Sequence, residues 1–136
     1  MTNSEKIKVL VAEDDPDMLE QIKLYLEAEG YEVLAAAGQK ETEAMLKPGA
    51  FQAAVLDLMM ENQDSGFVLS YKIKKMDPRI PVIIVTSVTR DTGHSFDKAQ
   101  DTKSWIKADV IINKELRFEQ LKGELKRLLG AAEAHA

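Results

Sequence analysis

Five short apolar segments, separated by stretches with helical spacing, are the feature that most limits the folds open to this chain. The segments cover residues 7–12, 31–36, 53–58, 80–86 and 110–112. Polar residues, or Pro and Gly, bound each segment, as is typical of buried strands. Because their apolarity is continuous rather than alternating, we expect a sheet that is covered on both faces.

The first predicted helix follows the first apolar segment. Leu19, Ile22 and Leu26 recur at helical spacing. Pro16 fits the first turn, where a missing N–H costs nothing, and Gly30 can end the helix. The sequence therefore predicts a helix between the first two strands.

Further helices are predicted along the rest of the chain. Shorter patterns indicate a second helix that stops before residues 48–49 and a third that stops before residues 77–78. A fourth helix is expected in the second half of residues 91–108. The last helix has the clearest amphipathic pattern, with apolar residues at Phe118, Leu121, Leu125 and Leu128. We expect residues 130–136 beyond it to form a flexible tail.

Strands that alternate with helices predict parallel pairing through right-handed crossovers. We therefore expect an α/β fold: a flavodoxin-like, doubly wound, five-stranded parallel sheet in the order 2-1-3-4-5, with helices on both faces. The 136 residues suit one domain, since single domains most often hold about 100–150 residues. We place its core at residues 6–129. Ligands of such sheets bind beyond the carboxyl ends of the strands.

Composition excludes several functional classes. The chain contains no Cys, so disulfides and Cys-ligated metals are ruled out. Its net charge of −5 argues against direct nucleic-acid binding through a basic surface. No apolar stretch approaches the roughly 20 residues that span a bilayer, and no N-terminal signal is visible. We therefore expect a cytoplasmic protein without membrane insertion.

Polar residues stand at the ends of four of the predicted strands. They are Glu13, Asp14 and Asp15 after the first, Asp57 after the third, Thr86 and Ser87 after the fourth, and Asn113 and Lys114 after the fifth. In the expected order these four strands are neighbours, so the groups should gather at one edge of the sheet. Carboxylates from two strands can hold Mg²⁺. Asp57 can act as the nucleophile of phosphoryl transfer, with Lys114 and Thr86 stabilising charge on the transferring group.

Each of these residues also has a plainer interpretation. Asp14 or Asp15 can cap the helix that follows. Asp57 can be a turn residue, Lys114 can be solvated, and Thr86 can reflect β-propensity alone. The set is more specific than its members, because four strand ends match in the right chain order. We therefore favour the functional interpretation.

The same segments resemble a known family. The motifs lie at residues 9–16, at residues 55–60 with Gly66 and Phe67, at residues 81–87 and at residues 112–114. In chain order they are similar to the acidic start, the phosphorylation segment, the switch strand and the lysine strand of two-component response-regulator receiver domains. The resemblance covers residues 6–129. It implies a single-domain receiver that is not an enzyme, beyond catalysing its own phosphorylation and dephosphorylation.

The resemblance implies a role for each acidic residue. Asp57 would accept a phosphoryl group from a histidine kinase or a phosphotransfer protein. Glu13 and Asp14 would form the acidic pair that binds Mg²⁺, with Asp14 the more direct ligand. Asp57 and the backbone carbonyl of Met59 would complete the protein's ligands.

The resemblance also implies how a signal would leave the domain. Lys114 would pair with the phosphoryl oxygens. Thr86 would move toward the phosphoryl group and shift the face formed by the fourth helix, the fifth strand and the fifth helix. We expect no attached DNA-binding or enzymatic domain. The output would therefore be contact with an unidentified downstream protein, phosphorelay or a phosphorylation-dependent dimer.

The sequence departs from the family pattern at several positions. Glu115 follows the lysine in place of the usual Pro, Ile111 replaces the switch aromatic, and Glu61 replaces a common Pro. The usual coupling of Thr86 to a rotating aromatic ring cannot operate in that form.

Two positions bear on how fast the phosphoryl group is lost. In receivers, the side chains two residues after the phosphoacceptor and two after the switch Thr lie near the attacking water. Here they are Met59 and Val88, both apolar. Neither can orient water by strong hydrogen bonding. We therefore expect a phosphoaspartate that hydrolyses slowly.

Two other functional classes compete with a signalling module. The first is an enzyme or cofactor carrier of similar architecture. An aspartyl phosphatase usually has a second Asp where this chain has Met59, and a flavin carrier would need a Ser/Thr-rich phosphate loop after the first strand, where this chain has acidic residues. The second is a phosphorylation-independent, receiver-like binding module, which the departures at Glu115 and Ile111 keep open.

Overall fold

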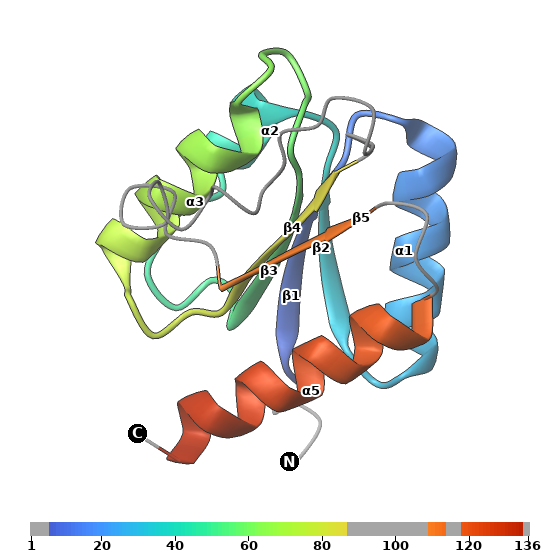
Figure 1. The fold of residues 1–136 in the computed structure, drawn as a ribbon, viewed down its shortest axis with the longest axis vertical. Helices are drawn as coiled ribbons and strands as arrows, with labels where there is room; N and C mark the ends of the chain where they lie inside the picture. The colour runs from blue at the N-terminus through green and yellow to red at the C-terminus, as the bar shows by residue number, and fades with distance from the viewer. Residues whose placement is uncertain (1–5, 87–108, 114–117, 135–136) are drawn as a thin grey trace.

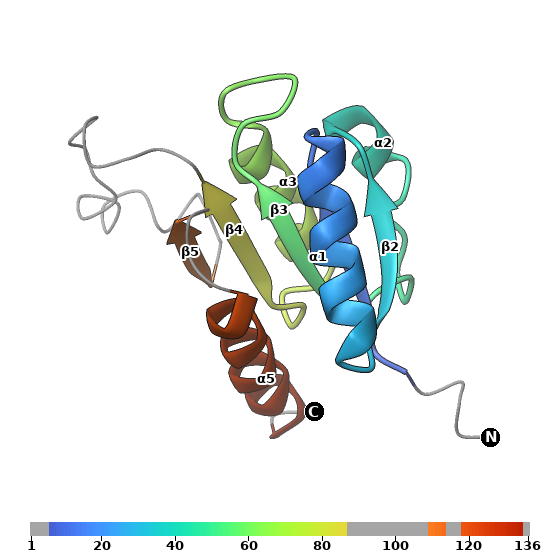
Figure 2. The same ribbon diagram turned by 90° about the vertical axis from the view of Figure 1, so that its right-hand side faces the viewer.

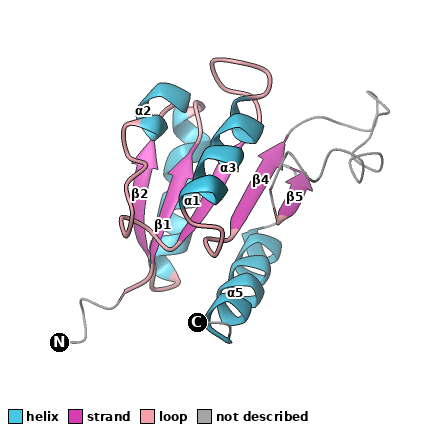
Figure 3. Ribbon diagram, turned by 90° about the vertical axis from the view of Figure 1, so that its left-hand side faces the viewer, coloured by secondary structure: helices cyan, strands magenta, loops and turns pink. Residues whose placement is uncertain are grey.

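The fold is built on one parallel sheet. The structure is a computed structural model, and it describes residues 6–86, 109–113 and 118–134. Its strands are β1 (Lys8–Ala12), β2 (Glu32–Ala36), β3 (Ala53–Asp57), β4 (Val82–Thr86) and β5 (Val110–Asn113). They run parallel in the order β2-β1-β3-β4-β5 (Figures 1 and 3). The predicted strand order 2-1-3-4-5 is confirmed.

Helices cover both faces of this sheet. Those within the described residues are α1 (Pro16–Ala28), α2 (Gln39–Glu43), α3 (Ser65–Met76) and α5 (Phe118–Ala134). α1 and α5 pack on one face, whereas α2 and α3 lie on the other (Figures 1 and 2). The predicted flavodoxin-like architecture is thus confirmed. None of the described helices is long and apolar enough to cross a membrane.

Alternating side chains divide the core into two layers. Leu10 and Ala12 of β1 face the layer under α3, whereas Val9 and Val11 face the layer under α1 and α5. In β3 and β4 every residue is buried, and only the last residue of each strand is polar. Because both faces of these strands are covered, apolar residues are needed at every position before the strand end.

Local sequence determines where α1 begins and ends. The carboxylate of Asp15 accepts hydrogen bonds from the backbone N–H groups of Asp17 (3.0 Å) and Met18 (3.4 Å). Pro16 occupies the first helical position. Beyond the helix, Gly30 has a φ of 98°, a left-handed conformation that Gly adopts without strain. Both predicted ends of this helix are confirmed.

The flexible tail expected from residue 130 stays a prediction, but its first residues belong to the last helix. α5 continues to Ala134, so these residues are helical. One Gly costs a helix only about 1 kcal/mol relative to Ala. The good helix formers after Gly130 outweigh that cost. The helix predicted within residues 91–108 lies outside the described residues.

Candidate functional site

The carboxyl ends of neighbouring strands form one edge of the sheet. In the register of the sheet, Ala12 lies beside Leu56, so the residues that follow β1 meet the end of β3. Asp57, the last residue of β3, lies beside Val85, one residue before β4 ends at Thr86. Side chains that are far apart in the sequence are therefore placed together here.

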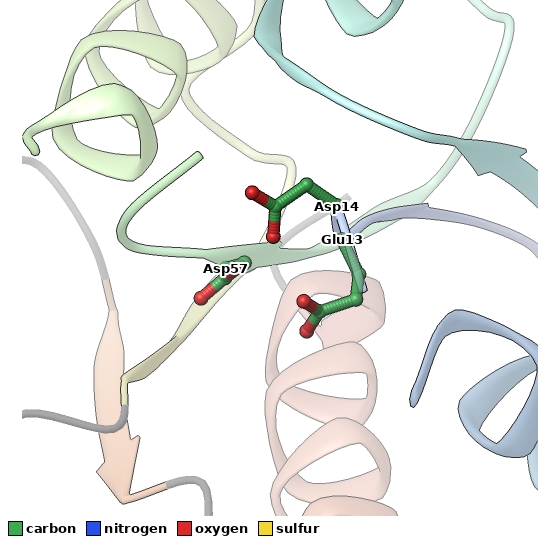
Figure 4. A group of neighbouring side chains, drawn as sticks. All are labelled: Glu13, Asp14 and Asp57. Atoms are coloured by element: carbon green, nitrogen blue, oxygen red, sulfur yellow. The ribbon is translucent and has the colours of Figure 1, made fainter. Parts of the chain in front are cut away.

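Three carboxylates converge at this edge. Glu13, Asp14 and Asp57 each offer an oxygen, and these oxygens lie within 4.8 Å of one another (Figure 4). Glu13 and Asp57 are buried, with 2% and 5% of their surface exposed, whereas Asp14 is exposed. Ionised carboxylates this close repel one another, and burial adds a desolvation penalty.

The donor set of this cluster fits Mg²⁺. A divalent cation offsets the mutual repulsion of the three carboxylates, and Mg²⁺ prefers oxygen ligands. Mg²⁺ usually keeps several waters, so a site bounded by the exposed Asp14 suits it better than a fully enclosed one. Among the described residues, Glu13, Asp14 and Asp57 are thus side chains that could hold the ion; their role as its ligands stays a prediction.

The consecutive acidic residues after β1 have different tasks. The backbone N–H of Glu13 donates to the carbonyl of Ala36 (3.1 Å), which extends the pairing with β2 beyond the strand end. The carboxylate of Glu13 accepts a hydrogen bond from the backbone N–H of Asp15 (3.1 Å). Asp15 is the residue that caps α1. The plainer interpretation, a helix cap, therefore holds for Asp15 and leaves Asp14 to the cluster.

The remaining predicted residues are only partly described. Thr86 is buried at the end of β4 and lies beside Asn113 of β5 in the register. Met59 follows β3, and 40% of its surface is exposed. Outside the described residues lie Lys114, Glu115 and Val88. The roles of Met59 as a metal ligand, of Thr86 as the switch and of Lys114 as the partner of the phosphoryl oxygens stay predictions, as does that of Asp57 as the nucleophile.

Backbone hydrogen bonds fix both ends of the loop of residues 58–64, which joins β3 to α3. The N–H of Leu58 donates to the carbonyl of Val85 (2.9 Å), and the N–H of Gly66 donates to the carbonyl of Leu58 (2.8 Å). A Cβ added to Gly66 would lie 2.8 Å from both the carbonyl oxygen of Asp57 and the Cα of Leu58. Gly is therefore required for α3 to begin this close to the end of β3.

The middle of the same loop is fixed by a residue to which the sequence assigned no role. The carboxylate of Glu61 accepts hydrogen bonds from the backbone N–H groups of Gln39 (2.5 Å) and Lys40 (3.1 Å) in α2. These hydrogen bonds, that from Gln39 above all, hold the pKa of Glu61 below its usual value. The signal in the sequence is a Glu where receivers commonly have Pro. No local pattern shows that its partners are 22 and 21 residues away.

Comparisons with known sequences agree with this geometry. The family model for the response regulator receiver domain matches residues 9–126. Transcriptional regulatory protein RprY of Bacteroides fragilis is 31% identical over 128 residues, which make up 92% of this chain and 50% of that protein. The chain spans half or less of the length of RprY and of other curated relatives it matches.

Solved structures of similar fold are also receiver domains or response regulators. A CheY-like receiver domain protein from Methanospirillum hungatei has a TM-score of 0.84 and 26% identity, and the match covers 97% of this chain and 100% of that one. Response regulator protein TrrA from Thermotoga maritima, solved in complex with Mg(2+)-BeF, has a TM-score of 0.74 and 26% identity, covering 90% of this chain and 98% of that one.

Proposed function

Because the chain belongs to the response regulator receiver domain family, we propose that Asp57 accepts a phosphoryl group from a histidine kinase or a phosphotransfer protein. Receiver domains are signalling domains of two-component systems rather than classical enzymes. The observation that carries the proposal is the convergence of Glu13, Asp14 and Asp57, whose oxygens lie within 4.8 Å of one another.

Asp57 is the nucleophile in this proposal. One of its carboxylate oxygens forms a bond to phosphorus while the bond between phosphorus and the imidazole nitrogen of the donor's phosphohistidine breaks. The electron pair of that bond stays with the imidazole nitrogen, which then takes up a proton. Asp57 ends a strand in which every residue is buried. The sheet therefore holds the nucleophile more firmly than a loop would.

Mg²⁺ is the cofactor in this proposal, and its ligands are Glu13, Asp14, Asp57 and the backbone carbonyl of Met59. When bound, the ion supplies positive charge that lowers the repulsion between the carboxylates and the incoming phosphoryl oxygens. The hydrogen bond from the N–H of Asp15 orients the carboxylate of Glu13. Glu13 and Asp14, which are adjacent in sequence, and Asp57, from the neighbouring strand β3, would thus hold the ion together.

The remaining roles follow the family. Lys114 and the hydroxyl of Thr86 would each donate a hydrogen bond to the phosphoryl oxygens. Thr86 is buried beside β5, so its movement would reach β5 first. Ile111, in β5, packs against the core layer that includes α3. We therefore propose a switch that acts through aliphatic packing rather than through a rotating aromatic ring.

The output of the domain is proposed from the same family relationship. A downstream protein would recognise the phosphorylated form by direct contact, through a phosphorelay or through a phosphorylation-dependent dimer. The proposal includes a cytoplasmic location and no direct contact with nucleic acid.

Incubation with acetyl phosphate and Mg²⁺, followed by intact-mass measurement, tests the proposal. The wild type should gain the mass of one phosphoryl group, and Asp57→Ala or chelation of Mg²⁺ should abolish the gain. Asp64→Ala is the matched control, because Asp64 is an exposed Asp in the loop of residues 58–64 that follows Asp57, and it should leave the gain intact. An undiminished gain in Asp57→Ala would reject Asp57 as the acceptor.

The same experiment distinguishes the alternative function. A folded wild type that gains no mass would favour a phosphorylation-independent binding module. The observation behind that alternative is Ile111, a partly buried aliphatic residue at the position where receivers usually carry the switch aromatic.

A further inference from the structure

The loop of residues 58–64 is tied to α2 as well as to the sheet. The carboxylate of Glu61 accepts hydrogen bonds from the backbone N–H groups of Gln39 and Lys40. These are the first two residues of α2, and no preceding helical turn can accept from their N–H groups. Gly38, the residue before the helix, supplies no side-chain cap. Glu61 therefore caps α2 from a distant part of the chain.

Gln39 binds the same loop a second time through its side chain. Its carbonyl oxygen accepts hydrogen bonds from the hydroxyl of Ser65 (2.6 Å) and from the amide of Asn62 (3.1 Å). The hydroxyl of Ser65 in turn accepts from the backbone N–H of Asn62 (3.0 Å). One residue of α2 is thus held through both its backbone and its side chain, and the loop is held with it.

The space for this contact depends on Gly38. A Cβ added to Gly38 would lie 2.8 Å from both carboxylate oxygens of Glu61. The backbone of Gly38 is extended, with a φ of 177°, which any residue can adopt. An added methyl group at this position would therefore conflict with the carboxylate of Glu61 and not with the backbone, and the flexible Glu61 side chain would have to move away.

We propose that Glu61 is a positioning residue for the Mg²⁺ site, because its cap on α2 fixes the loop that carries the backbone carbonyl of Met59. This inference rests on the proposed function in taking that carbonyl as a ligand. Met59 lies between Leu58, whose N–H is bonded to β4, and Glu61, which is bonded to α2. If the cap is removed, α2 holds the loop only through the side chain of Gln39, which accepts from Asn62 and Ser65. The carbonyl can then turn away, and Mg²⁺ must order it on binding.

Mg²⁺ affinity is the quantity that tests this role. Glu61→Ala should weaken Mg²⁺ binding about tenfold, as is typical for loss of a group that orients a metal ligand. Isothermal titration with MgCl₂ alone, without any phosphodonor, measures the change. Gly38→Ala should weaken binding in the same direction, because the added methyl group displaces the carboxylate. Combining Gly38→Ala with Glu61→Ala should cause no further loss, since the contact is already gone.

Glu41→Ala is the matched control for these variants. Glu41 accepts a hydrogen bond from the backbone N–H of Ala37 (2.5 Å), at the same end of α2. Among the described hydrogen bonds, none joins Glu41 to the loop, so Mg²⁺ affinity should stay at the wild-type value. Glu61→Gln keeps the size and one acceptor oxygen of Glu61 and should recover part of the affinity. It also replaces Glu61→Ala in the test if that variant fails to fold.

A purely structural role would lower the melting temperature of the variants without changing Mg²⁺ affinity. Wild-type affinity in folded Glu61→Ala or Gly38→Ala, or additive losses in the double variant, would therefore overturn the inference. If Glu61→Ala does not fold, wild-type affinity in Gly38→Ala alone has the same consequence.

Phosphorylation separates this inference from the proposed function. At saturating Mg²⁺ the initial rate of phosphorylation of Glu61→Ala by acetyl phosphate should approach that of the wild type. Only the Mg²⁺ concentration that gives half the maximal rate should rise. A wild type that binds Mg²⁺ but gains no phosphoryl group would reject the proposed function and leave the test of Glu61 intact. A wild type that binds no Mg²⁺ would reject both.

Discussion

Replacing Gly66 by Ala tests how closely α3 must approach β3. The added Cβ would lie 2.8 Å from the carbonyl oxygen of Asp57 and from the Cα of Leu58. Both are backbone atoms, which cannot rotate away as a flexible side chain can. The start of α3 must therefore shift, and the hydrogen bond from the N–H of Gly66 to Leu58 must lengthen.

The change in the free energy of unfolding follows from two destabilising contributions and one stabilising contribution. Overpacking of this kind costs about 1–3 kcal/mol, and a weakened backbone hydrogen bond costs up to about 1 kcal/mol more. Ala recovers up to about 1 kcal/mol through its higher helix propensity. The net destabilisation is then about 1–3 kcal/mol. With an unfolding entropy of about 2.1 cal/mol/K per residue over 136 residues, Tm should fall by about 3–10 °C.

Thermal and urea unfolding followed by circular dichroism measure the effect. Gly123→Ala is the matched control, because it lies in α5 and its added Cβ would meet no described atom within 4 Å. It should raise stability by up to about 1 kcal/mol. Gly66→Ala should also weaken Mg²⁺ binding, because the added methyl group would push against the backbone of Asp57. A melting temperature of Gly66→Ala that equals or exceeds the wild-type value would refute the reasoning from close packing.

Three further changes test other parts of the molecule. The hydrogen bond from the Arg79 side chain lowers the pKa of Asp77 in the folded protein. The ionised carboxylate of Asp77 therefore contributes its full stabilisation of the fold above the ordinary pKa of Asp, and this stabilisation is lost as the pH falls through the lowered pKa. Urea unfolding of Asp77→Asn should therefore depend less on pH below about 4 than that of the wild type, and parallel profiles would contradict this. Asp109→Ala removes the carboxylate that accepts a hydrogen bond from the backbone N–H of Val82 at 2.7 Å. It should lower the free energy of unfolding in urea by about 1–3 kcal/mol, and an unchanged value would show that water replaces the carboxylate. Met59→Asn places a hydrogen-bonding side chain near the attacking water and should shorten the lifetime of the phosphoaspartate several-fold, measured by phosphate release. Equal phosphoaspartate lifetimes in the variant and the wild type would show that the side chain at position 59 does not control hydrolysis.

The strands could be predicted almost to the residue because burial on both faces leaves a simple signature in the sequence. In β3 and β4 all residues are apolar until Asp57 and Thr86, where the strands end. Helix ends were predictable where a local signal exists, such as Pro16 at the start of α1. The end of α5 was not, because Gly130 looks like a stop, and the Ala-rich sequence after it continues the helix.

The site was predictable to the extent that strand order determines it. Once β1 and β3 are neighbours, Glu13 and Asp14 must lie near Asp57, and no detail of side-chain packing is needed. The contact of Glu61 with α2 has no such basis. It depends on how a loop and a short helix lie relative to each other, and neither hydrophobic period nor strand order specifies that arrangement.

Stability alone does not account for the polar residues at this edge of the sheet. Glu13 and Asp57 are buried at the ends of β1 and β3, close enough for their charges to repel each other. Apolar residues at the same positions would extend the pattern of the preceding strand and avoid the desolvation penalty. The apolar pattern of the buried strands is therefore interrupted at positions where both the burial and the charge of the residues oppose folding. Such a break is typical of functional positions, and a bound cation would turn the same charges into a favourable interaction.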